Sequence, residues 1–218
     1  MNSNLSVPDF SGDDFIDDKE IQEARKEAQA YKQMIENSLS IIKNELNLQE
    51  SSHKNLKSFH MFKSLKATLL DSFESRNFAS RMIVSVAEYM SGFPTAKNSN
   101  TGYDNYLFGY MEISKEYPST YICKESFQQK IVNLFLKNDT DFAEHRKFSG
   151  KFNVLTKDSK KLTDLFRFKD LDQLSIFPEM EIEIHGNECL FRNSRISLSP
   201  EQAIQFSDLA KMLCKTLN

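Results

Sequence analysis

Apolar residues recur every three or four positions from residue 17 to about residue 50, which is the spacing of one helix face. This stripe consists of Ile21, Ala24, Ala28, Tyr31, Ile35, Leu39, Ile42 and Leu46. Neither proline nor glycine interrupts the segment, and its first turn is acidic, which suits the positive end of a helix dipole. The pattern predicts one long amphipathic helix of roughly 30 residues within 17–51, about 45 Å long.

The stripe follows a heptad repeat from Ile21 to Ile35, which is typical of a coiled coil. The repeat then fails, because Ser38 and Glu45 stand where apolar residues are needed. Two arrangements therefore stay open: the helix packs on its own domain, or it projects and binds a partner protein or a second copy. In the second arrangement the expected partner-binding residues are Phe10, Phe15, Ile21, Tyr31 and Ile35.

A polar stretch at residues 51–58 separates this helix from a region whose apolar runs are shorter and richer in β-branched and aromatic side chains. Pro118 is expected to end or bend the strand in which it lies. Strands are predicted at 59–72, 82–90, 106–114, 120–123 and 152–156, with a long loop between the second and the third. The segment 59–72 also fits a helix, because it combines aromatic alternation with the helical spacing of Leu65 and Leu69.

Helical spacing returns in four later segments, at 125–136, 159–166, 171–176 and 200–217. Asp158 or Ser159 is expected to cap the second of these helices. The last helix has the clearest start, with Ser199 at the N-cap, Pro200 in the first turn and Gln202 at the capping-box position.

Apolar and polar residues alternate at 180–193, on both sides of Gly186-Asn187, a dipeptide typical of two-residue turns. The alternation predicts a β-hairpin with its tip at this dipeptide. Its buried face is expected to hold Ile182, Ile184, Cys189 and Phe191.

Antiparallel strands and separate helices, without a repeating strand–helix–strand order, predict an α+β fold: a mainly antiparallel sheet with helices packed on it. The expected organisation is a disordered acidic arm at 1–16, the long helix at 17–51 and an α+β domain at 56–218.

The net charge of −3 is too small to predict a nucleic-acid partner, and most of the imbalance lies in the acidic arm. The arm has the composition of a disordered motif that docks into a basic, apolar groove, although simple solubility explains it equally well. A basic run at 146–161 surrounds Phe148 and Phe152, which leaves peripheral contact with acidic lipids as an alternative.

Three cysteines at wide spacings, no signal peptide and no apolar run of membrane-spanning length favour a cytoplasmic protein. No cofactor or metal is expected, because glycine-rich phosphate loops are lacking and the four histidines do not stand at metal-ligand spacings.

Histidine beside carboxylates is the residue combination that general-base catalysis requires. His145 follows Glu144 and lies near Asp141, whereas His185 flanks the predicted hairpin tip. These residues support an alternative function as a hydrolase or transferase, provided that they converge in a pocket.

Several short segments together resemble a family of uncharacterised bacterial domains that often follow membrane helices. The segments are DFAEHRKFSGKFNVL at 141–155, VAEYMSG at 86–92, FGYMEI at 108–113 and TYICKESF at 120–127. The resemblance covers residues 59–217 and implies the architecture and a bacterial origin, but no activity and no site residues. Here the amphipathic helix stands where the family carries its membrane helices.

The favoured interpretation is a non-catalytic interaction protein that presents its N-terminal helix and acidic arm to a protein partner or to itself. Whether the chain is an enzyme stays open at this stage.

Overall fold

The computed structural model describes residues 18–52, 54–64, 67–75, 78, 80–91, 102–124, 140–193 and 198–218. The acidic arm with Phe10 and Phe15, most of the predicted long loop, and the predicted helix at 125–136 lie outside these residues. Within them the fold is α+β, as predicted, with a six-stranded antiparallel sheet and helices packed on it.

The first helix, α1 (Asp18–Leu46), confirms the long amphipathic pattern but ends earlier than the sequence suggested. Asn47 adopts a left-handed conformation with φ of 49°, which stops the helix. Residues Leu48–Glu50 then form strand β1, which pairs with β2 (Thr68–Ser75).

The strand predicted at 59–72 is wrong in its first half. Short helix α2 (His60–Lys63) occupies that part, and β2 begins only at Thr68. The apolar run did not distinguish the two structures, because Met61 and Phe62 are buried from a helical turn as effectively as from a strand.

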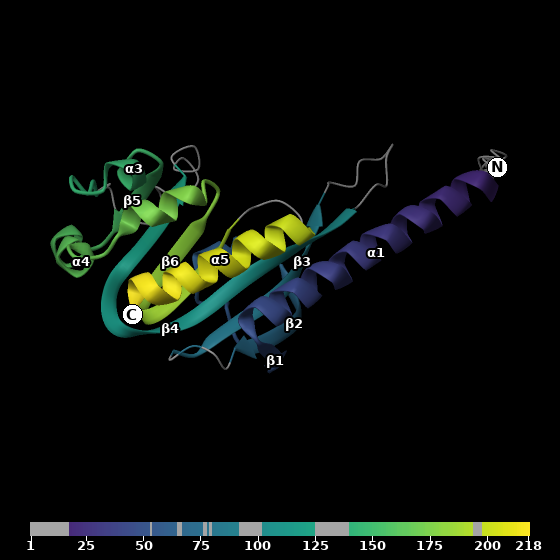
Figure 1. The fold of residues 1–218 in the computed structure, drawn as a ribbon, viewed down its shortest axis with the longest axis horizontal. Coiled ribbons are helices and arrows are strands. Elements are labelled where there is room, and N and C mark those ends of the chain that lie inside the picture. Colours follow the sequence, from purple (N-terminus) through teal and green to yellow (C-terminus); the bar gives the residue numbers. More distant parts are fainter. Residues whose placement is uncertain are drawn as a thin grey trace, which may run out of the picture.

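The sheet has the order β1-β2-β3-β4-β5, and β6 pairs with β4 off this path. It is completed by β3 (Met82–Ser91), β4 (Gly102–Lys124), β5 (Phe152–Thr156) and β6 (Glu181–Arg192). The strands predicted at 106–114 and 120–123 are one 23-residue strand, which turns through a U in Figure 1. Pro118 lies between Tyr117 and Thr120, where the pairing with β6 shifts register.

The predicted hairpin at 180–193 is wrong, because β6 is one continuous strand along β4. Gly186, at φ of 61°, sits where the register shifts, so it forms an irregularity within the strand instead of a reversal. The irregularity still turns Cys189 and Phe191 to the side that holds Ile182 and Ile184, so the predicted shared face is correct.

Three of the remaining helices lie close to their predicted positions: α4 (Ser159–Phe166), the 3₁₀ helix η2 (Leu171–Ile176) and α5 (Pro200–Leu217). The short helix α3 (Arg146–Ser149) was not predicted from the sequence. Asp158 accepts a hydrogen bond from the Lys161 amide and Ser199 accepts one from the Gln202 amide, which confirms both predicted caps.

The sheet has two buried sides. The side covered by α1, α4 and α5, here called the α5 face, holds the larger core and the stacked rings of Phe191 and Phe206. The opposite side, here called the α2 face, is covered by residues 54–63, with Phe59 and Phe62 against Tyr110 and Phe108.

Helix α1 belongs to the body only in its second half. Ile42 and Leu46 are buried in the core, and Glu45 pairs with Lys211 of α5, whereas the first half extends away from the rest of the molecule (Figure 1). No helix in the described part of the chain is both long and apolar enough to span a membrane.

Candidate functional site

Strand β6 places two carboxylates on the α2 face in complete burial. Glu181 and Glu183 are both 0% exposed. Glu181 accepts hydrogen bonds from the Tyr121 hydroxyl at 2.6 Å and from the Arg192 guanidinium at 2.8 Å. Burial, reinforced by the neighbouring Glu181, raises the pKa of Tyr121, so this hydroxyl stays a hydrogen-bond donor.

Glu183 joins helix α2 to the sheet. Its two carboxylate oxygens accept hydrogen bonds from the backbone amides of His60, at 2.8 Å, and Met61, at 2.7 Å. The residue preceding α2, Phe59, has no side chain that can cap these amides, so a carboxylate distant in sequence supplies the bonds.

The same carboxylate contacts His185, whose Nε2 lies 2.7 Å from Glu183 Oε1. The other ring nitrogen, Nδ1, lies 3.4 Å from the hydroxyl of Ser119 in β4. Ser119, His185 and Glu183 therefore form a hydroxyl–imidazole–carboxylate chain, in which the carboxylate is buried and the imidazole is 30% exposed. This order of groups is the one by which enzymes orient a histidine base beside a serine nucleophile.

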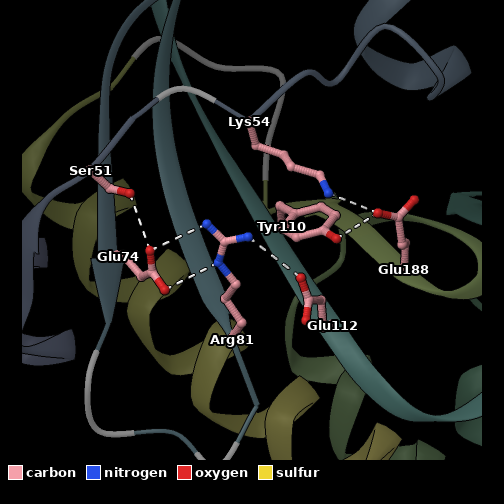
Figure 2. A network of polar contacts seen from close by, with 7 residues as sticks. All are labelled: Ser51, Lys54, Glu74, Arg81, Tyr110, Glu112 and Glu188. Carbon is pink, nitrogen blue, oxygen red and sulfur yellow. Dashed lines mark hydrogen bonds and ion pairs between the residues drawn. The ribbon is translucent and has the colours of Figure 1, made fainter.

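Next along the α2 face, the half-buried Lys54 and Glu188 meet the fully buried Tyr110 (Figure 2). The Tyr110 hydroxyl and the Lys54 ammonium both donate to Glu188, at 2.7 and 2.9 Å, and Lys54 sits over the Tyr110 ring. The hydrogen bond from Tyr110, followed by that from Lys54, lowers the pKa of Glu188. Burial raises the pKa of Tyr110 to about 12.

Figure 2 also shows Arg81 bridging Glu74 of β2 and Glu112 of β4, at 3.2 and 3.6 Å. Ser51 donates to Glu74 from the segment after β1. All three charged side chains are more than a third exposed, so this part of the network contributes little to stability and has the character of a surface ion pair.

A separate cavity of about 290 Å³ lies between residues 141–145 and α4. It brings together Asp141, Glu144 and His145, the catalytic candidates of the sequence, with Thr163 and Arg167. However, neither carboxylate is hydrogen-bonded to the His145 ring, and His145 Nε2 is buried without a hydrogen-bond partner. The ring therefore lacks the orienting partner that general-base catalysis needs.

The structure thus separates the two histidine candidates. His145 lies at the α4 cavity, whereas His185 lies on the α2 face beside Glu183 instead of at a hairpin tip. The site residues predicted from the sequence do not include Ser119, Glu181 or Glu183. The alternation of Glu181, Glu183 and His185 indicates one shared face, but a polar face of an alternating strand normally lies in water.

The predicted partner-binding residues of α1 differ in their surroundings. Ile21 is 36% exposed. Tyr31 is half-buried, and its hydroxyl accepts a hydrogen bond from the Asn105 side chain. Ile35 packs against the core. Only the first turns of the helix therefore expose this stripe.

Comparison with known proteins gives no assignment. No known family, curated protein or solved structure matches the chain. The resemblance to uncharacterised bacterial domains stays a prediction.

Metal ligands and thiols are the other reactive groups to consider. The described residues contain no group of three histidine, cysteine or acidic side chains that could hold a metal ion. Cys123 and Cys189 are buried, and burial raises the pKa of the Cys189 thiol and brings that of Cys214 to about 11. Neither Cys189 nor Cys214 has the lowered pKa of a nucleophilic thiol.

Proposed function

We propose that this protein is a non-catalytic interaction module that binds a protein partner through the first half of α1 and the acidic segment before it. One observation carries the proposal. Every side chain that the structure describes between Lys19 and Ala30 is exposed, whereas the rest of the same helix packs against the body. Helices in proteins gain most of their stability from the packing of an apolar face, so contact with a partner would stabilise the projecting half.

The partner proposed is a protein with a basic groove that has an apolar floor. The apolar stripe of the projecting half, with Ile21 at its end, continues the stripe that Ile42 and Leu46 bury in the core. The segment before it carries Asp9, Asp13, Asp14 and Asp17. Apolar contact along the stripe and charge complementarity beside it therefore support the same partner surface.

Photo-crosslinking in the cells that produce the protein tests this proposal. A benzoylphenylalanine at Gln22 reports on the projecting half, and one at Gln205, an exposed glutamine of α5, is the matched control. We expect a protein adduct at position 22 that is lost in Ile21→Asp and is lacking at position 205. Equal adducts at both positions, or none at position 22, would overturn the proposal, and an adduct with a second copy would identify self-association instead.

The chain of Ser119, His185 and Glu183 favours a second candidate, a serine hydrolase. In this reaction the Ser119 hydroxyl attacks an ester carbonyl and passes its proton to His185, which returns it to the departing alcohol. Water then releases the acid from the acyl-serine. Glu183 orients the imidazole and stabilises its protonated form.

Labelling with a fluorophosphonate probe tests this candidate, because the probe reacts with activated serines. We expect phosphonylation of Ser119 that disappears in Ser119→Ala and falls strongly in His185→Gln. Ser52→Ala serves as the control, because Ser52 is exposed and does not belong to the group of Ser119, His185 and Glu183. A failure to label Ser119, or equal labelling in the wild type and His185→Gln, excludes the hydrolase.

A further inference from the structure

Phe168 has an unusual environment for a phenylalanine of this protein. Its side chain is 92% exposed, whereas every other phenylalanine that the structure describes is buried or half-buried. It lies in the turn after α4, which the hydrogen bond from the Lys169 amide to the Phe166 carbonyl closes. This turn directs Phe166 into the core and leaves Phe168 in solvent.

Cations flank this side chain. Arg167 and Lys169 are its neighbours in the chain, and Lys160 and Lys161 stand exposed on α4. The acidic residues of the same region are engaged close by: Asp158 caps α4, Asp164 pairs with Arg167, and Asp170 binds the Gln173 side chain. Neither Lys160 nor Lys161 forms an ion pair in the described part of the structure, so both ammonium groups are available to an external anion.

A further observation concerns Lys169, which is half-buried. Burial lowers its pKa, and the positive charge of Lys115 in β4 lowers it further. The two lysines therefore lie close enough for their positive charges to repel each other, which adds positive potential beside the turn.

We propose that the turn Arg167–Lys169, together with Lys160 and Lys161, docks this protein peripherally onto a bilayer that contains anionic lipids. Phe168 inserts at the boundary between head groups and acyl chains, and the cations contact lipid phosphates. A membrane fits better than a protein groove, because a single aromatic side chain that is exposed on a turn, with cations before and after it in the chain, suits a soft, extended anionic surface. The proposal concerns a different surface from the projecting half of α1 and does not depend on it.

Vesicle co-sedimentation with the full chain tests the proposal. We expect binding to vesicles of phosphatidylcholine with phosphatidylserine, weaker binding at higher salt, and little binding to phosphatidylcholine alone. Phe168→Ser should lower the partition coefficient about tenfold, as expected for losing a partly inserted aromatic side chain. Ile204→Ser, at a 51% exposed apolar residue of α5, should leave it unchanged.

Two further measurements separate the lipid surface from other anions. The double variant Lys160→Gln/Lys161→Gln should weaken binding to the anionic vesicles and reduce its salt dependence. Soluble glycerophosphoserine at the same head-group concentration should not compete, because it offers no apolar layer to Phe168. Equal losses in Phe168→Ser and Ile204→Ser, equal binding to both vesicle types, or full competition by glycerophosphoserine would each overturn the proposal.

Discussion

Arg192 and Glu181 meet at 2.8 Å although they lie 11 positions apart on the same strand. An extended strand would separate their backbones by about 36 Å. The contact is made because β6 follows β4 through its bend, which brings the two ends of β6 toward each other (Figure 1). This buried ion pair therefore depends on the bend of β4 and β6, and the same bend brings Ser119 close to His185.

Removal of one partner of this pair should destabilise the protein strongly. Arg192→Met removes the ion-pair partner of the fully buried Glu181, and an uncompensated buried charge costs about 3–5 kcal/mol. The double variant Glu181→Gln/Arg192→Met should recover part of this loss, because it removes both charges. Urea unfolding of the single and double variants measures the coupling, and additive losses would contradict it.

A second test concerns Gly109, over which the Phe191 ring lies. A Cβ atom at this position would be only 2.0 Å from Phe191 Cζ. Gly109→Ala should therefore lower the free energy of unfolding by about 1–3 kcal/mol, the usual cost of overpacking. Phe191→Leu in the same chain should restore part of it, whereas Gly150→Ala, where the nearest atom is 3.1 Å away, should have a smaller effect.

The elements that were predicted wrongly from the sequence share one physical property, which is that remote partners determine their structure. Elements with local start and stop signals, such as α4 with its Asp158 cap and α5 with its Ser199 cap, were predicted correctly. The dipeptide Gly186-Asn187 suits a tight turn and a strand irregularity equally well, because both use the left-handed conformation of glycine. Only the pairing with β4, which is remote in sequence, decides between them.

The arrangement of Ser119, His185 and Glu183 also depends on partners that are remote in sequence, so the sequence did not indicate it. Alternation along β6 indicated that Glu183 and His185 share a face, but an alternating acidic face normally meets water. Here residues 54–63 cover it, and Glu183 is satisfied by the amides of α2. No local pattern indicates such a partner.

A third prediction concerns stability at alkaline pH. Burial raises the pKa of Tyr110 and of Tyr117 to about 12, and Tyr117 donates to the Leu217 carbonyl. The unfolded chain loses these protons near pH 10, whereas the folded protein keeps them until about pH 12. The contribution of the two tyrosines to the free energy of unfolding should therefore be fully present below pH 10. It should fall as the pH rises toward 12, by up to about 1.4 kcal/mol per pH unit for each tyrosine.

Unfolding free energies measured from pH 8 to pH 12 test this relationship. Tyr117→Phe should lower stability at pH 8 by about 1 kcal/mol, because a buried hydrogen bond is lost, yet it should make the alkaline decline shallower. An unchanged slope in this variant would show that Tyr117 does not contribute to the decline.

The fourth prediction concerns the end of α1, which determines where the projecting helix joins the sheet. Asn47 holds a left-handed conformation that asparagine tolerates better than alanine does. Asn47→Ala should therefore lower the free energy of unfolding by about 1 kcal/mol, and Asn47→Gly should keep or raise it. Asn44→Ala, within the helix and exposed, is the control and should have little effect. If Asn47→Ala were as stable as the control, the turn between α1 and β1 would not depend on the left-handed residue, and the helix would be free to continue toward residue 50 as its sequence pattern predicts.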